Sequence, residues 1–137
     1  MPLQSRWMLR LSLIWLMISV TIGGLILIEK AISFIPMIWG FLPIHYELAI
    51  WGWMVQFVLA TAYWMFPKFL TGSRRGPEWI AWCVFGFLNT GLTSLISSYI
   101  YNSDKLAQAG RGMILLSIIL FVSLIWNRVV TYRNRGH

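Results

Sequence analysis

Four apolar blocks, each about as long as a bilayer is thick, account for nearly the whole chain. About 20 apolar residues in a helix cross the hydrocarbon core of a membrane with every backbone group hydrogen-bonded internally. Only 11% of the 137 residues are charged, whereas a soluble domain carries about a quarter. The sequence therefore predicts one all-α domain, residues 1–137, with four transmembrane helices in an antiparallel bundle. The expected spans are 8–29, 45–66, 78–100 and 111–130.

The basic residues are distributed unequally between the two sides of the expected bundle. One side, which holds both termini and the second connection, carries Arg6, Arg10, Lys68, Arg74, Arg75, Arg128, Arg133 and Arg135. The other side carries Lys30, Lys105 and Arg111. The positive-inside rule then places both termini in the cytoplasm, and we expect a bacterial inner (cytoplasmic) membrane protein. Charges beside membrane ends account for the net charge of +7 without a nucleic-acid partner.

Small and polar residues indicate where helices approach each other. In the first span, Ser12, Ser19 and Gly23 share a face, and Gly23–Gly24 permits close approach of another helix. In the third span the corresponding ladder is expected to face other helices, with a ligand contact as the alternative. Its members are Gly86, Asn89, Thr90, Thr93 and Ser97. Two prolines and several aromatic residues predict an interfacial loop or short re-entrant turn over 31–44.

Most catalytic chemistry is excluded by the small number of suitable residues. The four acids, Glu29, Glu47, Glu78 and Asp104, all lie at expected helix ends or in loops, so no intramembrane carboxylate pair forms. The sequence contains no nucleophile elbow, phosphate loop or Cys/His metal spacing. The single Cys83 lies within an apolar block and is expected to be a buried, inert thiol. We therefore expect no independent enzymatic activity.

The second span carries the most informative pattern, which we call the polar stripe: His45, Gly52, Gln56 and Tyr63. On an ideal α-helix these four residues fall within about 20° of one line. A helical histidine commonly holds haem iron, so His45 is a candidate metal ligand with Gly52, Gln56 and Tyr63 as cofactor contacts. The alternative is an interfacial histidine on a stripe that only packs helix against helix.

The pattern of His45, Gly52, Ala60 and Tyr63–Trp64–Met65–Phe66–Pro67–Lys68 resembles the second helix of haem–copper oxidase catalytic subunits. That superfamily includes the cbb3-type oxidases and the nitric oxide reductases. The resemblance implies that His45 ligates a low-spin haem at the outer membrane side and that Pro67–Lys68 is the inner exit. It does not extend to oxygen or nitric oxide reduction, because the chain lacks the family's later helices and their histidines.

Two functions follow from these patterns, and both stay open at this point. One is an oxidase-like membrane protein that binds haem b through His45 and transfers electrons in a respiratory chain. The other is a non-catalytic accessory subunit of a larger membrane complex with no cofactor of its own. In either case the partners are the lipid bilayer and a homo-oligomer or larger complex. Two copies related by an axis along the membrane normal would place their His45 residues at one depth, where they could share one haem.

Overall fold

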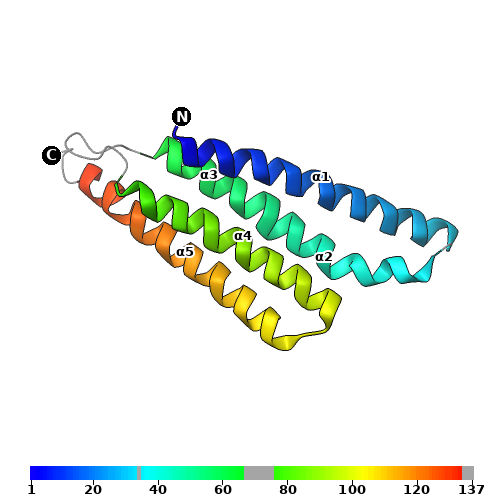
Figure 1. The fold of residues 1–137 in the computed structure, drawn as a ribbon. Helices are drawn as coiled ribbons and strands as arrows, with labels where there is room; N and C mark the ends of the chain where they lie inside the picture. The colour runs from blue at the N-terminus through cyan, green and yellow to red at the C-terminus, as the bar shows by residue number, and fades with distance from the viewer. Residues whose placement is uncertain (34, 67–75, 134–137) are drawn as a thin grey trace.

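The structure is a computed structural model that describes residues 1–33, 35–66 and 76–133, and these residues are almost entirely helical (Figure 1). Its elements are α1 (Leu3–Ile32), the 3₁₀ turn η1 (Pro36–Phe41), α2 (Leu42–Glu47), the π-helical η2 (Leu48–Val55), α3 (Gln56–Met65), α4 (Glu78–Tyr101) and α5 (Asp104–Arg133). The predicted inner exit Pro67–Lys68, most of the basic second connection and the tail 134–137 lie outside the described residues.

Four helical segments are long and apolar enough to cross a membrane. They are Leu3–Ile32, Pro36–Met65, Glu78–Tyr101 and Asp104–Trp126. The all-α class and the number of candidate spans predicted from the sequence are therefore confirmed for the described residues. The second and fourth segments begin earlier than expected, at Pro36 and Asp104, and the first extends beyond its apolar block at both ends.

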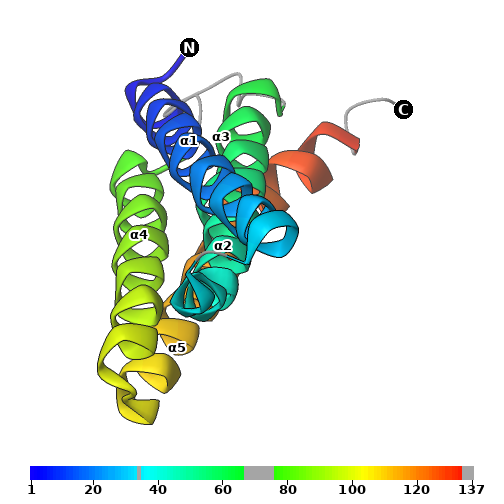
Figure 2. The same cartoon turned by 90° about the vertical axis from the view of Figure 1, so that its right-hand side faces the viewer.

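The elements form two helical hairpins that lie against each other (Figures 1 and 2). The N-terminal hairpin pairs α1 with the second segment, residues 36–65, and the C-terminal hairpin pairs α4 with α5. Successive segments alternate in direction, so Leu3, Met65 and Glu78 lie at one end of the molecule, together with the end of α5. We call this the near end, and the opposite end, with Ile32, Pro36 and Asp104, the far end.

The first connection is helical over most of its length, and the predicted loop over 31–44 is wrong. Ser33 ends α1 in the left-handed conformation at φ 51°, and its N–H donates to the Glu29 carbonyl. The Glu29 carboxylate accepts the Ile35 N–H at 2.5 Å, and the chain enters η1 at once. Pro36 and Pro43 each lie in the first turn of a helical piece, where a missing N–H costs nothing. These prolines start helices here and do not interrupt one.

The last helix begins at Asp104, seven residues before the expected start at 111. Asn102 closes α4 in the left-handed conformation at φ 49°, so the turn between α4 and α5 is short. Asp104 lies in the first turn of α5, where an acid interacts favourably with the helix dipole. The polar residues after it continue the helix up to Gly110, which packs on Gly91 and Leu95 of α4.

The C-terminal hairpin is held by direct backbone contact between two glycines. A Cβ added at Gly91 would lie 2.8 Å from the Gly110 carbonyl oxygen, and one added at Gly110 would lie 2.7 Å from that of Gly91. Ser117 Oγ donates to the Val84 carbonyl at 2.9 Å farther along the same interface. Small residues permit this close approach, which is the usual basis of helix association in a bilayer.

The predicted interface ladder on α4 is wrong for Thr93, whereas the Thr90 hydroxyl does reach another helix, 3.7 Å from Met113 Sδ of α5. Thr90 and Thr93 are exposed, and their hydroxyls donate to Gly86 O at 2.8 Å and Asn89 O at 3.0 Å on the same helix. A Thr hydroxyl bonded to the carbonyl one turn earlier is already satisfied and needs no partner helix. Asn89 does contact another helix, because its Oδ1 accepts the Trp15 indole N–H at 3.0 Å.

Candidate functional site

His45 lies in α2 and is bonded to Ser19 of α1 through both its ring and its backbone. Its Nδ1 is 2.8 Å from the Ser19 carbonyl oxygen, and Ser19 Oγ is 3.1 Å from Nδ1. The Ser19 hydroxyl donates to the His45 carbonyl at 3.1 Å. Because a carbonyl only accepts, this arrangement assigns the proton of the neutral imidazole to Nδ1. Nε2 then carries a free lone pair.

Gly23 makes room for the imidazole ring. A Cβ at this position would lie 2.7 Å from His45 Cε1 and 3.1 Å from Nδ1, closer than side-chain atoms approach one another. The Tyr46 ring lies next to the imidazole, with centroids 5.6 Å apart and a tilt of 49°. The small-residue face predicted for the first span comprised Ser12, Ser19 and Gly23. Two of these residues, Ser19 and Gly23, do contact the second segment.

A shallow groove of about 460 Å³ borders the histidine at the surface between α1 and α2. Its lining is Val20, Gly23, Gly24, Ile26, Leu27, Leu42, His45 and Tyr46. A Cβ at Gly24 would meet no atom within 4 Å, so this glycine widens the groove. Among the described residues no hydrogen bond to His45 Nε2 occurs. The groove thus combines an apolar lining with one nitrogen that can bind a metal ion.

The remaining stripe residues are packed between helices and do not line this groove. A Cβ at Gly52 would lie 2.9 Å from the Trp15 side chain, so α1 covers this position. Gln56 is fully buried, and its Nε2 donates to the Met8 carbonyl of α1 at 3.1 Å. Tyr63 is 1% exposed and lies beneath the Arg128 guanidinium. A haem macrocycle that lay along the whole stripe would have to displace α1. Cofactor contact by Gly52, Gln56 and Tyr63 therefore stays a prediction.

Two features of the site escaped the sequence reasoning. The first is the π-helical segment Leu48–Val55 directly after α2, where amides bond five residues back instead of four. Such segments often occur at functional sites, but nothing in the apolar sequence from Leu48 to Val55 indicates one. The second is the hydrogen bonding of Ser19 to His45. The sequence indicated Ser19 only as one of the small residues on a shared face of the first span.

Other metal-binding constellations are not found in the part of the chain that the structure describes. No group of three or more His, Cys, Asp or Glu side chains comes together there. Cys83 is half-buried with a free thiol. Comparison of the chain with known proteins finds no matching family, no similar curated protein and no similar solved structure.

Proposed function

We propose that this chain is an integral protein of the bacterial inner membrane that binds haem b through His45. Its four helices would form an antiparallel bundle with both termini in the cytoplasm, and its role would be electron transfer without independent catalysis. The observation that carries the proposal is the state of the imidazole. Nδ1 is held by the Ser19 carbonyl at 2.8 Å, and His45 is one of the residues that line an apolar groove.

The residues present fit the group at its axial position. A metal-ligating histidine normally donates its other ring N–H to a carbonyl or carboxylate, which fixes the tautomer and the ring orientation. His45 donates its Nδ1–H to the Ser19 carbonyl in the same way. The glycines of α1 leave the groove free of side chains next to the imidazole, and Leu27 and Leu42 supply apolar walls. When bound, a haem would supply one-electron redox chemistry at this outer position.

A second copy of the chain would supply the sixth ligand. His45 is the only histidine in the described residues, so one chain offers one axial nitrogen there. The groove lies on the surface of the molecule and not within its core, so a partner could approach it from the bilayer. A two-fold axis along the membrane normal would bring two His45 side chains to the same depth.

Absorption spectroscopy of the purified full-length protein tests this proposal. We expect a Soret band and a b-type pyridine haemochrome spectrum, both lost in His45→Ala. Tyr46→Phe is the matched control, because it changes the neighbouring ring and keeps the imidazole. In His45→Gly, added imidazole should restore the band. An unchanged Soret band in His45→Ala would overturn the assignment of the ligand.

The packing of the other stripe residues favours a second candidate, an accessory subunit without a cofactor. Gly52, Gln56 and Tyr63 are sealed against neighbouring helices, as in a stripe whose role is helix packing. Such a protein would be stable and colourless when purified from cells supplied with haem. It would also migrate with a larger complex in native gels after mild solubilisation.

A further inference from the structure

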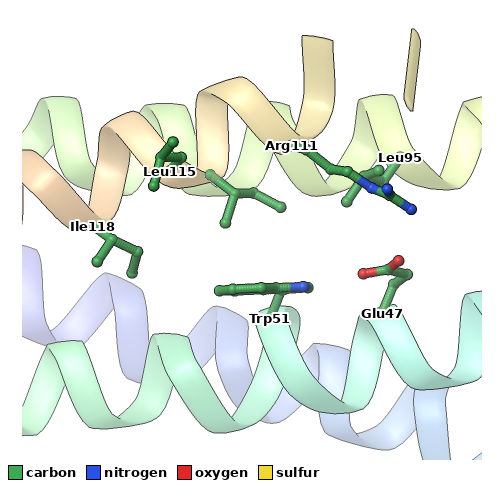
Figure 3. A pocket seen from close by; sticks show the side chains of 7 residues that line it. Glu47, Trp51, Leu95, Arg111, Leu115 and Ile118 are labelled. Atoms are coloured by element: carbon green, nitrogen blue, oxygen red, sulfur yellow. The ribbon is translucent and has the colours of Figure 1, made fainter. Parts of the chain in front are cut away.

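A second hollow lies between the two hairpins, away from the histidine. It is a pocket of about 450 Å³ between the second segment and α5 (Figure 3). Its lining is Glu47, Trp51, Leu95, Arg111, Ile114, Leu115 and Ile118. Glu47 follows His45 by two residues and so points about 160° away from it around the helix. The pocket is therefore separate from the proposed haem site.

Two opposite charges face each other across this pocket. Glu47 projects from α2 toward Arg111 of α5, and the Trp51 ring lies one turn farther along the same wall (Figure 3). In the described structure no ion pair joins the carboxylate to the guanidinium. The Tyr99 hydroxyl donates to Glu47 Oε1 at 3.0 Å, which leaves the other carboxylate oxygen for a ligand. The Tyr99 hydroxyl also interacts with Arg111, so it lies between the two charges, and the pocket beside it offers both signs of charge to a ligand.

Arg111 lies close enough to the far end of α5 for its long side chain to reach the level of lipid headgroups. α5 has 30 residues, which at 1.5 Å per residue span about 45 Å, the thickness of a bilayer with its headgroups. Arg111 lies seven residues into α5, about 10 Å from its far end. The aliphatic lining continues for two more turns to Ile118, toward the middle of the membrane. A polar head above an apolar chain fits this order of residues.

We propose that this pocket binds phosphatidylethanolamine. Its phosphate would accept hydrogen bonds from Arg111, and its ammonium group would donate to Glu47. One acyl chain would lie against Trp51, Leu115 and Ile118. An anionic lipid would satisfy Arg111 but bring a negative charge near Glu47, and a phosphatidylcholine head lacks the N–H donors that a carboxylate requires.

Native mass spectrometry of the full-length protein in detergent tests the assignment. Phosphatidylethanolamine, phosphatidylcholine and phosphatidylglycerol are added at equal concentrations. We expect about a tenfold preference for phosphatidylethanolamine, the effect of one charge-assisted hydrogen bond. Glu47→Gln should abolish the preference over phosphatidylcholine, Arg111→Gln should weaken all three lipids, and Ile118→Trp should exclude them by filling the pocket.

Two further variants separate lipid recognition from folding. Lys105→Gln removes an exposed cation at the same far end and should leave the preference unchanged. Tyr99→Phe removes the hydrogen bond to Glu47 but keeps the carboxylate, so selectivity should survive. Equal binding of the three lipids, a preference for phosphatidylglycerol, or selectivity that persists in Glu47→Gln would overturn the proposal. Absence of any bound lipid would overturn it too.

Discussion

At the residue scale, the glycines of this protein divide into two kinds. Gly91 and Gly110 lie where α4 and α5 touch backbone to backbone, and an added methyl group would lie within 2.8 Å of a carbonyl oxygen. Gly86 and Gly112 belong to the same two helices, but a Cβ there would meet nothing within 4 Å. The same residue type therefore has opposite consequences for stability at neighbouring positions.

Alanine substitution at these glycines should show the difference. We expect Gly91→Ala and Gly110→Ala to lower the free energy of unfolding by about 1–3 kcal/mol, because the helices must move apart. Gly86→Ala and Gly112→Ala should raise it by up to about 1 kcal/mol through better helix propensity. Thermal unfolding in detergent, followed by circular dichroism, measures both pairs. Equal effects in the two pairs would show that the hairpin does not have this contact.

The bond between Ser19 and His45 is also a residue-scale feature that can be measured. Ser19→Ala removes the hydroxyl but keeps the carbonyl that holds Nδ1, so haem binding should persist. The lost bond to the His45 carbonyl should cost about 0.6 kcal/mol, the average for hydrogen bonds between membrane helices. A double-mutant cycle with His45→Ala isolates the hydroxyl contact with Nδ1. A coupling energy of zero would mean that this contact contributes nothing to stability.

At the element scale, the second segment changes helix type three times between Pro36 and Met65, from 3₁₀ to α, to π and back to α. The π-helical part, Leu48–Val55, separates the half that carries His45 and Glu47 from the half that carries Gln56 and Tyr63. Each turn there holds more residues than an α-turn, so angles calculated for an ideal α-helix do not apply across it. Even so, three residues of the polar stripe, His45, Gly52 and Gln56, all contact α1.

Removing one residue from the π-helical part should be tolerated better than removing one from a regular helix. Deletion of the exposed Ile50 lets the segment close into an α-helix while the flanking contacts persist, so we expect a loss below about 1 kcal/mol. Deletion of the exposed Val58 in α3 rotates the rest of the helix by about 100° and should cost more than about 2 kcal/mol. Urea unfolding in detergent compares the two deletions. A larger loss on deletion of Ile50 would contradict this account.

At the scale of the whole molecule, the two hairpins are joined at the near end by Arg128 and toward the far end by the Tyr99–Glu47 hydrogen bond beside the pocket. Arg128 of α5 is 2% exposed, lies 5.6 Å from the centre of the Tyr63 ring and donates to the Phe66 carbonyl at 2.7 Å. A cation at the last carbonyls of α3 also interacts favourably with the helix dipole. At the far end, the corresponding space between the hairpins is the pocket between Glu47 and Arg111.

Replacement of the two arginines should therefore affect different properties. Arg128→Met should lower the free energy of unfolding by about 2–3 kcal/mol, because the carbonyls of α3 lose a charged donor. Arg128→Lys should retain part of this stability. The matched change Arg111→Met, at an exposed position, should have a small effect on unfolding and act on lipid binding instead. A thermal scan of the three variants in one detergent tests the contrast, which fails if Arg111→Met is the more destabilising.

The orientation of the molecule in the membrane is a further property of the whole chain. Eight basic residues against three predict, by the positive-inside rule, that both termini lie in the cytoplasm. A green fluorescent protein fused to the C-terminus should fluoresce, and an alkaline phosphatase fused there should be inactive. Fusions in the turn at Asn102 should give the reverse. An active phosphatase at the C-terminus would invert the proposed topology.

The sequence alone was sufficient to predict the all-α class and four helices apolar enough to cross a membrane, because apolar length is a local property that any segment carries by itself. The helix starts at Pro36 and Asp104 were missed, since proline and charged residues occur in loops as well as in first turns. The small-residue face of α1 was correctly recognised at Ser19 and Gly23. The sequence did not indicate that His45 is the residue that packs against that face.

Only the tertiary structure decided what each polar group does. Ser19 and His45 are 26 residues apart, Glu47 and Tyr99 are 52 apart, and Tyr63 and Arg128 are 65 apart. Such pairs depend on how helices rotate and cross, and a π-helical segment alters that rotation without any mark in the sequence. His45 was a candidate ligand because of its residue type. The bond that holds its Nδ1, and the pocket between Glu47 and Arg111, depend instead on how the helices pack.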